Sequence, residues 1–321
     1  MKIIIDNNII TEENIKKINE AGIFNKIKEN KMEFYASAKL YEQLLPYLLK
    51  LNDTKRKLIV DFLYELTGNS RIFDSIGSIS QKELDNTRGK YQFVPCAMQK
   101  RIIPTNLYSQ TNVQTILNLF NRSMPNAKAA HNEIKNWASK NRKFIQDLSS
   151  KKISDIDNNI TDIMSKRGFD EKSISAAINI VKSGNELDSL SAQEKKNRIY
   201  ENLFFLLMEF DFLVQLKEQK QLIKNENFYK SYYPQYYKPS FTKTMVKTTL
   251  YGYSYKVCGD QYQKSYDEDW VNDSSYICYT YFADILLTND TKYMKNAFDW
   301  IYEKNKEILT LNEFIDKYCK R

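Results

Sequence analysis

Short β-branched runs alternate with amphipathic stretches at the start of the chain. KIIID (2–6) has the apolar character of a buried strand that ends at Asp6, and EFYASA (33–38) predicts a second strand. KLYEQLLPYLLKL (39–51) has helical spacing, with Pro46 as an expected kink. This order of strand and helix predicts the beginning of a parallel α/β sheet.

The middle of the chain has a different pattern. From about residue 53 to about residue 221, apolar positions recur mainly with helical spacing. The α/β pattern returns near the C-terminus, where SSYICYTYFA predicts a helix, DILLT a buried strand, DTKYMKNAFDWIYEKN a helix and EILTL a last strand. We therefore expect a discontinuous α/β domain, 1–55 plus 245–321, split by a mainly helical insertion, 56–244. TTLYGYSYKV (248–257) is a candidate for the third strand.

The amino-acid composition and the absence of certain motifs argue against several classes of fold and function. The 321 residues include only 8 Gly and 6 Pro, which argues against a turn-rich all-β fold. A net charge of +8 permits a polyanionic partner such as nucleic acid, although biased composition explains it equally well. One histidine and four scattered cysteines argue against a zinc site and against a Ser-His-Asp or Cys-His nucleophile. Neither GxGxxG nor GxxxxGK[ST] occurs, so a nucleotide-binding phosphate loop is not expected.

The sequence also predicts where the protein works. The N-terminus has no basic segment followed by a long apolar run, so no signal peptide is expected. The most apolar stretch, LFFLLMEFDFLVQL, is too short to span a bilayer and contains Glu209 and Asp211. We expect a soluble cytoplasmic protein without a membrane partner.

Four acidic residues follow or adjoin the predicted strands. Asp6 ends the first strand, Glu42 lies one turn into the helix after the second, Asp273 opens the helix before DILLT, and Asp290 lies just past DILLT. In a parallel sheet these positions converge on the carboxyl edge, where ligands collect. Carboxylates placed together repel one another unless cations neutralise them, and hard oxygen ligands suit Mg²⁺ or Mn²⁺. Such an ion orients a water for attack on a phosphodiester.

The order of IIIDNNI, an acid in YEQLL, NDSSYICYTYFA, DILLTND and EILTLNEFI resembles the PIN domain family. The resemblance covers roughly residues 1–55 and 265–321. It implies an α/β/α sandwich with a central parallel sheet, interrupted here by the helical insertion. It also implies a hydrolase, namely a metal-dependent nuclease or endoribonuclease. RNA is favoured over DNA through this resemblance alone.

The resemblance assigns roles to individual residues. The catalytic and metal-binding acids would be Asp6, Glu42, Asp273 and Asp290. Asn8 would support the site as part of a D-x-N signature, and Thr288 as part of T-x-D. Asp269 is a possible extra ligand, with a solvated loop charge as its alternative.

Simpler structural roles are open for the same residues. Asp273 could cap its helix, Asn289 and Asp290 could form a turn, and Glu42 could be a solvated helix residue. A non-catalytic nucleic-acid-binding or scaffold protein of PIN-like fold is the alternative function. A protein regulator such as an antitoxin is a partner class that the sequence leaves open.

An aromatic, basic segment, NFYKSYYPQYYKPSFTK (227–243), is a candidate nucleic-acid contact. Bases stack on such rings while lysines meet phosphates. Packing of the insertion onto the sheet is the alternative role. The residues of this segment assigned to nucleic-acid binding are Tyr232, Tyr233, Tyr236, Tyr237 and Lys238.

Overall fold

The computed structural model of the protein describes part of the chain, which falls into two compact units. The described residues are 1–68, 71–79, 107–123, 156–166, 168–182, 268–302 and 305–320, with isolated positions at 132, 136, 191–192, 195, 241, 244–245 and 248. Two compact units divide the chain: Met1–Glu133 with Tyr266–Arg321, and Ile134–Ser265.

The first unit is built on a parallel sheet of five strands in the order β3-β2-β1-β4-β5. The strands are β1 (Lys2–Ile5), β2 (Glu33–Ser37), β3 (Ile72–Phe73), β4 (Ile285–Leu287) and β5 (Glu307–Leu309). β1 pairs with β2 on one side and with β4 on the other, and all four pairings are parallel. The predicted α/β class with a central parallel sheet is confirmed.

Helices cover both faces of this sheet. Phe34 and Tyr35 are neighbours on β2, so their side chains point to opposite faces. The Phe34 ring meets Phe314 of α16 (Leu311–Tyr318) edge to face. Tyr35 stacks on Phe73, which in turn stacks on Tyr279 of α14 (Glu268–Tyr279).

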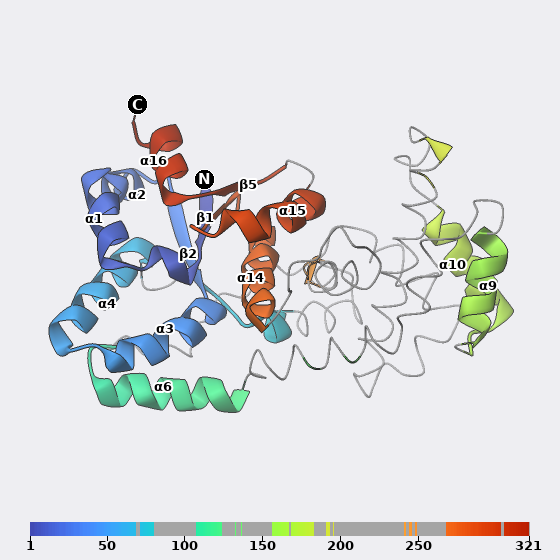
Figure 1. Cartoon of the computed structure of the whole chain (residues 1–321), viewed down its shortest axis with the longest axis horizontal. Helices are drawn as coiled ribbons and strands as arrows, with labels where there is room; N and C mark the ends of the chain where they lie inside the picture. Colours follow the sequence, from blue (N-terminus) through green and yellow to red (C-terminus); the bar gives the residue numbers. More distant parts are fainter. Residues whose placement is uncertain are drawn as a thin grey trace. The chain divides into compact units, whose positions relative to one another are not determined.

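The other described helices of this unit lie between the strands in the chain sequence. They are η1 (Asn7–Ile9), α1 (Glu12–Glu20), α2 (Ile23–Lys28), α3 (Ala38–Lys50), α4 (Asp53–Thr67), α6 (Gln110–Ser123), η6 (Thr280–Phe282) and α15 (Thr291–Tyr302). In Figure 1, α1, α2 and α4 lie on one side of β1 and β2, with α14 on the other. The three isoleucines of β1 are fully buried, as expected for a strand covered on both faces.

Buried hydrogen bonds fix the turn between α3 and α4. Arg56 is 2% exposed, and its guanidinium donates to the carbonyl oxygens of Leu48, Leu51 and Tyr108. The first two carbonyls belong to the end of α3, where backbone acceptors lack the amides of a continuing helix. The Leu48 carbonyl also accepts from the Leu51 amide. Arg56 therefore joins α3, α4 and the segment before α6.

Two sequence predictions differ from the structure. β3 lies at Ile72–Phe73, inside the region expected to be helical, because two residues are too few to give a strand pattern. Most of the candidate third strand, 248–257, lies outside the described residues. The unit that carries the sheet also extends past the expected boundary at residue 55, because α4, β3 and α6 pack with it.

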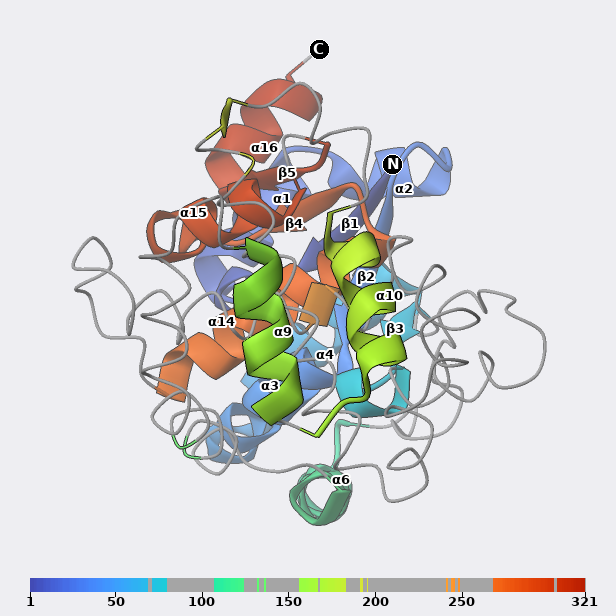
Figure 2. The same ribbon diagram turned by 90° about the vertical axis from the view of Figure 1, so that its right-hand side faces the viewer.

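The second unit contains a helix pair. α9 (Ile156–Lys166) and α10 (Glu171–Val181) lie side by side (Figure 2), and Lys182 Nζ is 2.8 Å from Asp157 Oδ1 across the pair. Within the described part of the chain, no helix combines the length and apolar composition needed to cross a bilayer.

Candidate functional site

The topology of the sheet identifies one edge position where a ligand is expected. The chain leaves β1 toward β2 and β3, whereas it leaves β4 in the opposite direction toward β5. In open α/β sheets, ligands bind outside the carboxyl ends of the strands at such a switch point. Asp6 follows β1 and Thr288 follows β4, so both residues lie at the switch point.

Asp6, Asn8 and Thr288 are joined there by short hydrogen bonds. The Thr288 hydroxyl donates to Asp6 Oδ2 at 2.7 Å, and Asn8 Nδ2 donates to the same oxygen at 2.7 Å. Asn8 Nδ2 also lies 3.0 Å from Thr288 Oγ1. The one-turn helix η1 brings Asn8 back over Asp6, which explains the D-x-N spacing.

The backbone after β4 completes this network. The amide of Asp290 donates to Thr288 Oγ1 at 3.1 Å, and the amide of Asn289 donates to Asn8 Oδ1 at 2.9 Å. Asn289 Oδ1 in turn accepts from the amide of Leu311 at the start of α16. The ends of β1, β4 and β5 are thus held in one arrangement.

The carboxylate at the centre of the network lies in an unfavourable electrostatic environment. Asp6 is 5% exposed, and burial raises its pKa to about 6 against the opposing effect of hydrogen bonds from Thr288, Asn7 and Asn8. The negative charge of Asp290 raises the pKa further. Burial also raises the pKa of Asp290 itself. Within the described residues, no lysine or arginine forms an ion pair with either aspartate. A bound cation would therefore stabilise the ionised form of both carboxylates.

Asp273 lies inside α14 rather than at its start. The helix begins at Glu268, so the expectation that Asp273 opens or caps this helix is wrong. Asp269 is the exposed residue one turn earlier on the same face of α14, so it belongs to the helix and not to a loop. Asp290 immediately precedes α15, which leaves its role as a turn or capping residue open.

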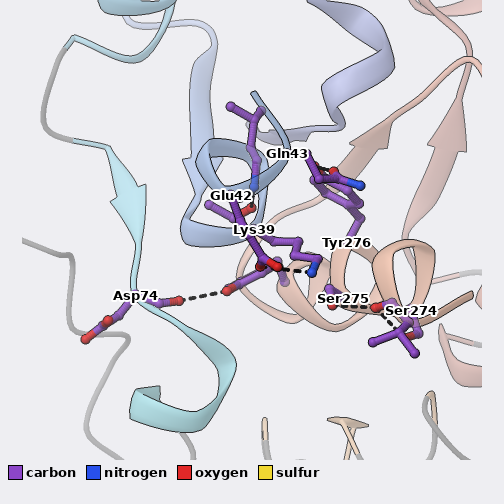
Figure 3. Close-up of polar contacts among 11 residues, drawn as sticks. Lys39, Glu42, Gln43, Asp74, Ser274, Ser275 and Tyr276 are labelled. Atoms are coloured by element: carbon purple, nitrogen blue, oxygen red, sulfur yellow. Dashed lines mark hydrogen bonds and ion pairs between the residues drawn. The ribbon is translucent and has the colours of Figure 1, made fainter. Parts of the chain in front are cut away.

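Tyr276 connects α14 to α3 and to η1. Its buried hydroxyl donates to Gln43 Oε1 at 2.6 Å (Figure 3), and it also accepts from the amide of Asn7. Burial, together with the charges of Asp6 and Asp273, raises the pKa of Tyr276 well above its ordinary value. Asp6 and Asp273 therefore act electrostatically on the same hydroxyl.

Glu42 forms an ion pair with a lysine that the sequence reasoning missed. Lys39 Nζ lies 2.9 Å from Glu42 Oε2, and both side chains extend from α3 (Figure 3). Glu42 is therefore not simply a solvated helix residue. Lysine is unfavourable in the first turn of a helix, where acidic residues are preferred. That local conflict was the signal in the sequence.

Asp74 is a second residue that the sequence reasoning missed. It follows β3 and is buried, but its carboxylate accepts from the Ser75 amide and the Ser78 hydroxyl. Its carbonyl oxygen accepts from the Tyr279 hydroxyl. Since the carboxylate already has local donors, Asp74 stabilises this corner of the sheet.

The complete set of four metal-binding acids stays a prediction. Among the described residues, no three His, Cys, Asp or Glu side chains are grouped so that they could hold a metal ion. The structure brings together Asp6, Asn8 and Thr288 directly, and the charge of Asp290 acts on Asp6. The charge of Asp273 acts on the Tyr276 hydroxyl, as does that of Asp6. The proposed nucleic-acid contacts lie outside the described residues: Tyr232, Tyr233, Tyr236, Tyr237 and Lys238.

Comparison of the chain with protein-family models, with curated proteins and with solved structures gives no match in any of the three.

Proposed function

We propose that the protein is a divalent-metal-dependent nuclease of PIN-like fold that hydrolyses phosphodiester bonds, with RNA as the preferred substrate. The observation that carries this proposal is the Asp6–Asn8–Thr288 network at the switch point of the parallel sheet. It links the two motifs, D-x-N and T-x-D, that carry the resemblance to the PIN family. The preference for RNA rests on that resemblance.

The oxygen atoms at this edge suit Mg²⁺ or Mn²⁺. Asp6 and Asp290 would hold the ion, with Asp273 as the third acid. Burial and the nearby charge of Asp290 raise the pKa of Asp6, so its ionised form is unfavourable, and a divalent ion would supply a compensating charge. When bound, such an ion lowers the pKa of a water molecule and neutralises charge on the phosphate.

The chain's own residues hold the acids in position. Thr288 donates to Asp6 and accepts from the amide of Asp290, so one hydroxyl sets the relation between the two acids. Asn8 donates to Asp6 and accepts from the amide of Asn289. These hydrogen bonds fix the position of Asp6 and of the Asp290 backbone before any cation binds.

The test is cleavage of labelled single-stranded RNA, and separately DNA, with Mg²⁺, Mn²⁺ or a chelator. We expect metal-dependent cleavage that stops with the chelator and in Asp6→Asn. Asp316→Asn is the matched control, because Asp316 is exposed on α16 and pairs with Lys320. Undiminished cleavage by Asp6→Asn would refute the proposal. Stronger cleavage of DNA would reverse only the substrate preference.

One observation favours the alternative of a non-catalytic nucleic-acid-binding or scaffold protein. The described residues contain no group of three potential metal ligands. The same assay separates the two functions. A wild-type protein that binds RNA yet cleaves neither substrate with any divalent ion would be the non-catalytic form.

A further inference from the structure

Among the helical ion pairs in the described part of the first unit, that of Lys39 and Glu42 differs because both of its side chains are largely buried. The two side chains are only 9% and 20% exposed, with 2.9 Å between Nζ and Oε2. The pair of Lys17 and Glu13 on α1 is as close, at 2.7 Å, but its side chains are 37% and 77% exposed. Lys39 and Glu42 have therefore both been largely removed from water.

The pair lies at the edge of the sheet that carries Asp6. In the register of β1 and β2, Ile4 is opposite Tyr35, so continuation of the register places Asp6 opposite Ser37. Neighbouring strands are about 5 Å apart. Ser37 caps α3, and Lys39 is the second residue of that helix. The hydrogen bond from Tyr276 to Gln43 joins the next turn of α3 to α14.

A contribution to folding stability does not explain why a lysine occupies position 39. A cation in the first turn of a helix opposes the helix dipole, at a cost of about 0.3–1 kcal/mol. Burial of an ion pair costs desolvation energy that the attraction between the charges often fails to recover. Residues that break a local rule in this way are expected at functional sites.

The positive charge at this edge is not shared with the aspartates. Lys39 pairs with Glu42, whereas no lysine or arginine in the described part of the chain pairs with Asp6 or Asp290. A metal ion that used Glu42 would have to displace the ammonium group first. The ammonium group has three donors, and Glu42 accepts from it through one oxygen.

We propose that Lys39 binds a phosphate of the nucleic-acid substrate and that Glu42 is a positioning residue for Lys39, not a metal ligand. This inference rests on the proposed nuclease function and divides the predicted acid set into two parts. Asp6, Asp290 and Asp273 form the cation side of the site. Lys39, held by Glu42, forms the side that receives a non-bridging phosphate oxygen through a charge-assisted hydrogen bond.

The first arm of the test measures RNA binding without cleavage. The anisotropy of a labelled single-stranded RNA is followed in chelator at several KCl concentrations. We expect Lys39→Gln to weaken binding about tenfold. The slope of log K against log salt should become shallower by about 0.7, as expected for one lost phosphate contact. Lys39→Arg should retain most of the affinity, and Lys17→Gln on the exposed pair of α1 is the matched control.

The second arm measures the rise in melting temperature with Mn²⁺ in the absence of RNA. Glu42→Gln should keep the wild-type rise, whereas Asp6→Asn should lose it. Circular dichroism of each variant confirms that it is folded. Loss of the Mn²⁺ response in Glu42→Gln would make Glu42 a metal ligand and overturn the inference.

The two arms separate this inference from the proposed function. Equal RNA affinity and equal salt dependence of Lys39→Gln and Lys17→Gln would remove Lys39 from the substrate site, while metal-dependent cleavage by the wild type would leave the nuclease function standing. A wild type that binds neither RNA nor Mn²⁺ would refute both.

Discussion

Replacement of Asp6 by Asn should stabilise the metal-free protein above pH 6. Burial raises the pKa of Asp6 from 3.8 to about 6 in the folded state. A difference of about two units corresponds to roughly 3 kcal/mol, since one unit is about 1.4 kcal/mol. Asn keeps the shape and the acceptor for Thr288 and Asn8 but loses acceptors for the amides of Asn7 and Asn8, which offsets roughly 1 kcal/mol. We expect a net gain of about 1–3 kcal/mol at pH 8.

The pH dependence follows from the direction of the pKa shift. Because the folded state holds the proton more tightly, wild-type stability falls as the pH rises from about 4 to about 6. The penalty is complete above pH 6 and absent below about pH 4. The advantage of Asp6→Asn should therefore disappear as the pH is lowered through this window.

The assay is urea denaturation followed by circular dichroism between pH 4 and pH 8, in chelator and with Mn²⁺. At about 100 times its dissociation constant, an ion that binds only the folded protein adds roughly 2.7 kcal/mol to wild-type stability. This gain should be absent in Asp6→Asn. A variant that is less stable than the wild type at pH 8, or that responds equally to Mn²⁺, would show that Asp6 is a structural residue of the β1 turn.

Three further changes test other parts of the structure. Thr288→Val removes the hydroxyl that joins Asp6 to the amide of Asp290, so we expect the free energy of unfolding to fall by about 1–3 kcal/mol. The Mn²⁺ response should also weaken, with Thr288→Ser as the control. An unchanged Mn²⁺ response would contradict the role of this hydroxyl at the site. Arg56→Met removes a buried side-chain donor from three backbone carbonyls, so we expect it to destabilise the first unit by about 2–5 kcal/mol in denaturant titration. A loss below about 1 kcal/mol would contradict this account. Replacement of four aromatic residues by Leu should weaken RNA binding by about 1–3 kcal/mol for each lost stack, and unchanged affinity of the folded variant would assign the rings to packing. These residues are Tyr232, Tyr233, Tyr236 and Tyr237.

The sequence predicted β1 and β4 because each has a run of at least three consecutive apolar residues. β1 and β4 are short but strongly apolar, and each is followed by a polar motif that marks its end. Residues of the D-x-N and T-x-D motifs meet in the Asp6–Asn8–Thr288 network, because residues after adjacent parallel strands lie at one edge. Their role at a metal site stays a prediction. β3 escaped prediction because Ile72 and Phe73 alone show no periodicity.

The side-chain partners at the site were harder to predict. Asp273 was expected at a helix start because Asn272 and Asp273 are good capping residues, yet α14 begins five residues earlier. Glu42 was expected to be one of the four metal-binding acids, but its carboxylate forms an ion pair with Lys39, one turn before it on α3. Spacing in the sequence gives the face of a helix, whereas the choice between partners depends on packing of distant segments.

The pairing of β1 with β4 has a consequence for how the protein is made. Asp6 and Thr288 are 282 residues apart in the chain, so one edge of β1 has no partner until β4 has been synthesised. At about 5–20 residues per second, that wait lasts roughly 15–60 s. During this time the edge of KIII is an open, apolar template for pairing with other chains. A nascent chain that stops before β4 would expose this unpaired strand edge and would lack the Asp6–Asn8–Thr288 network. We therefore expect chains without β4 to aggregate and chains with β4 to fold.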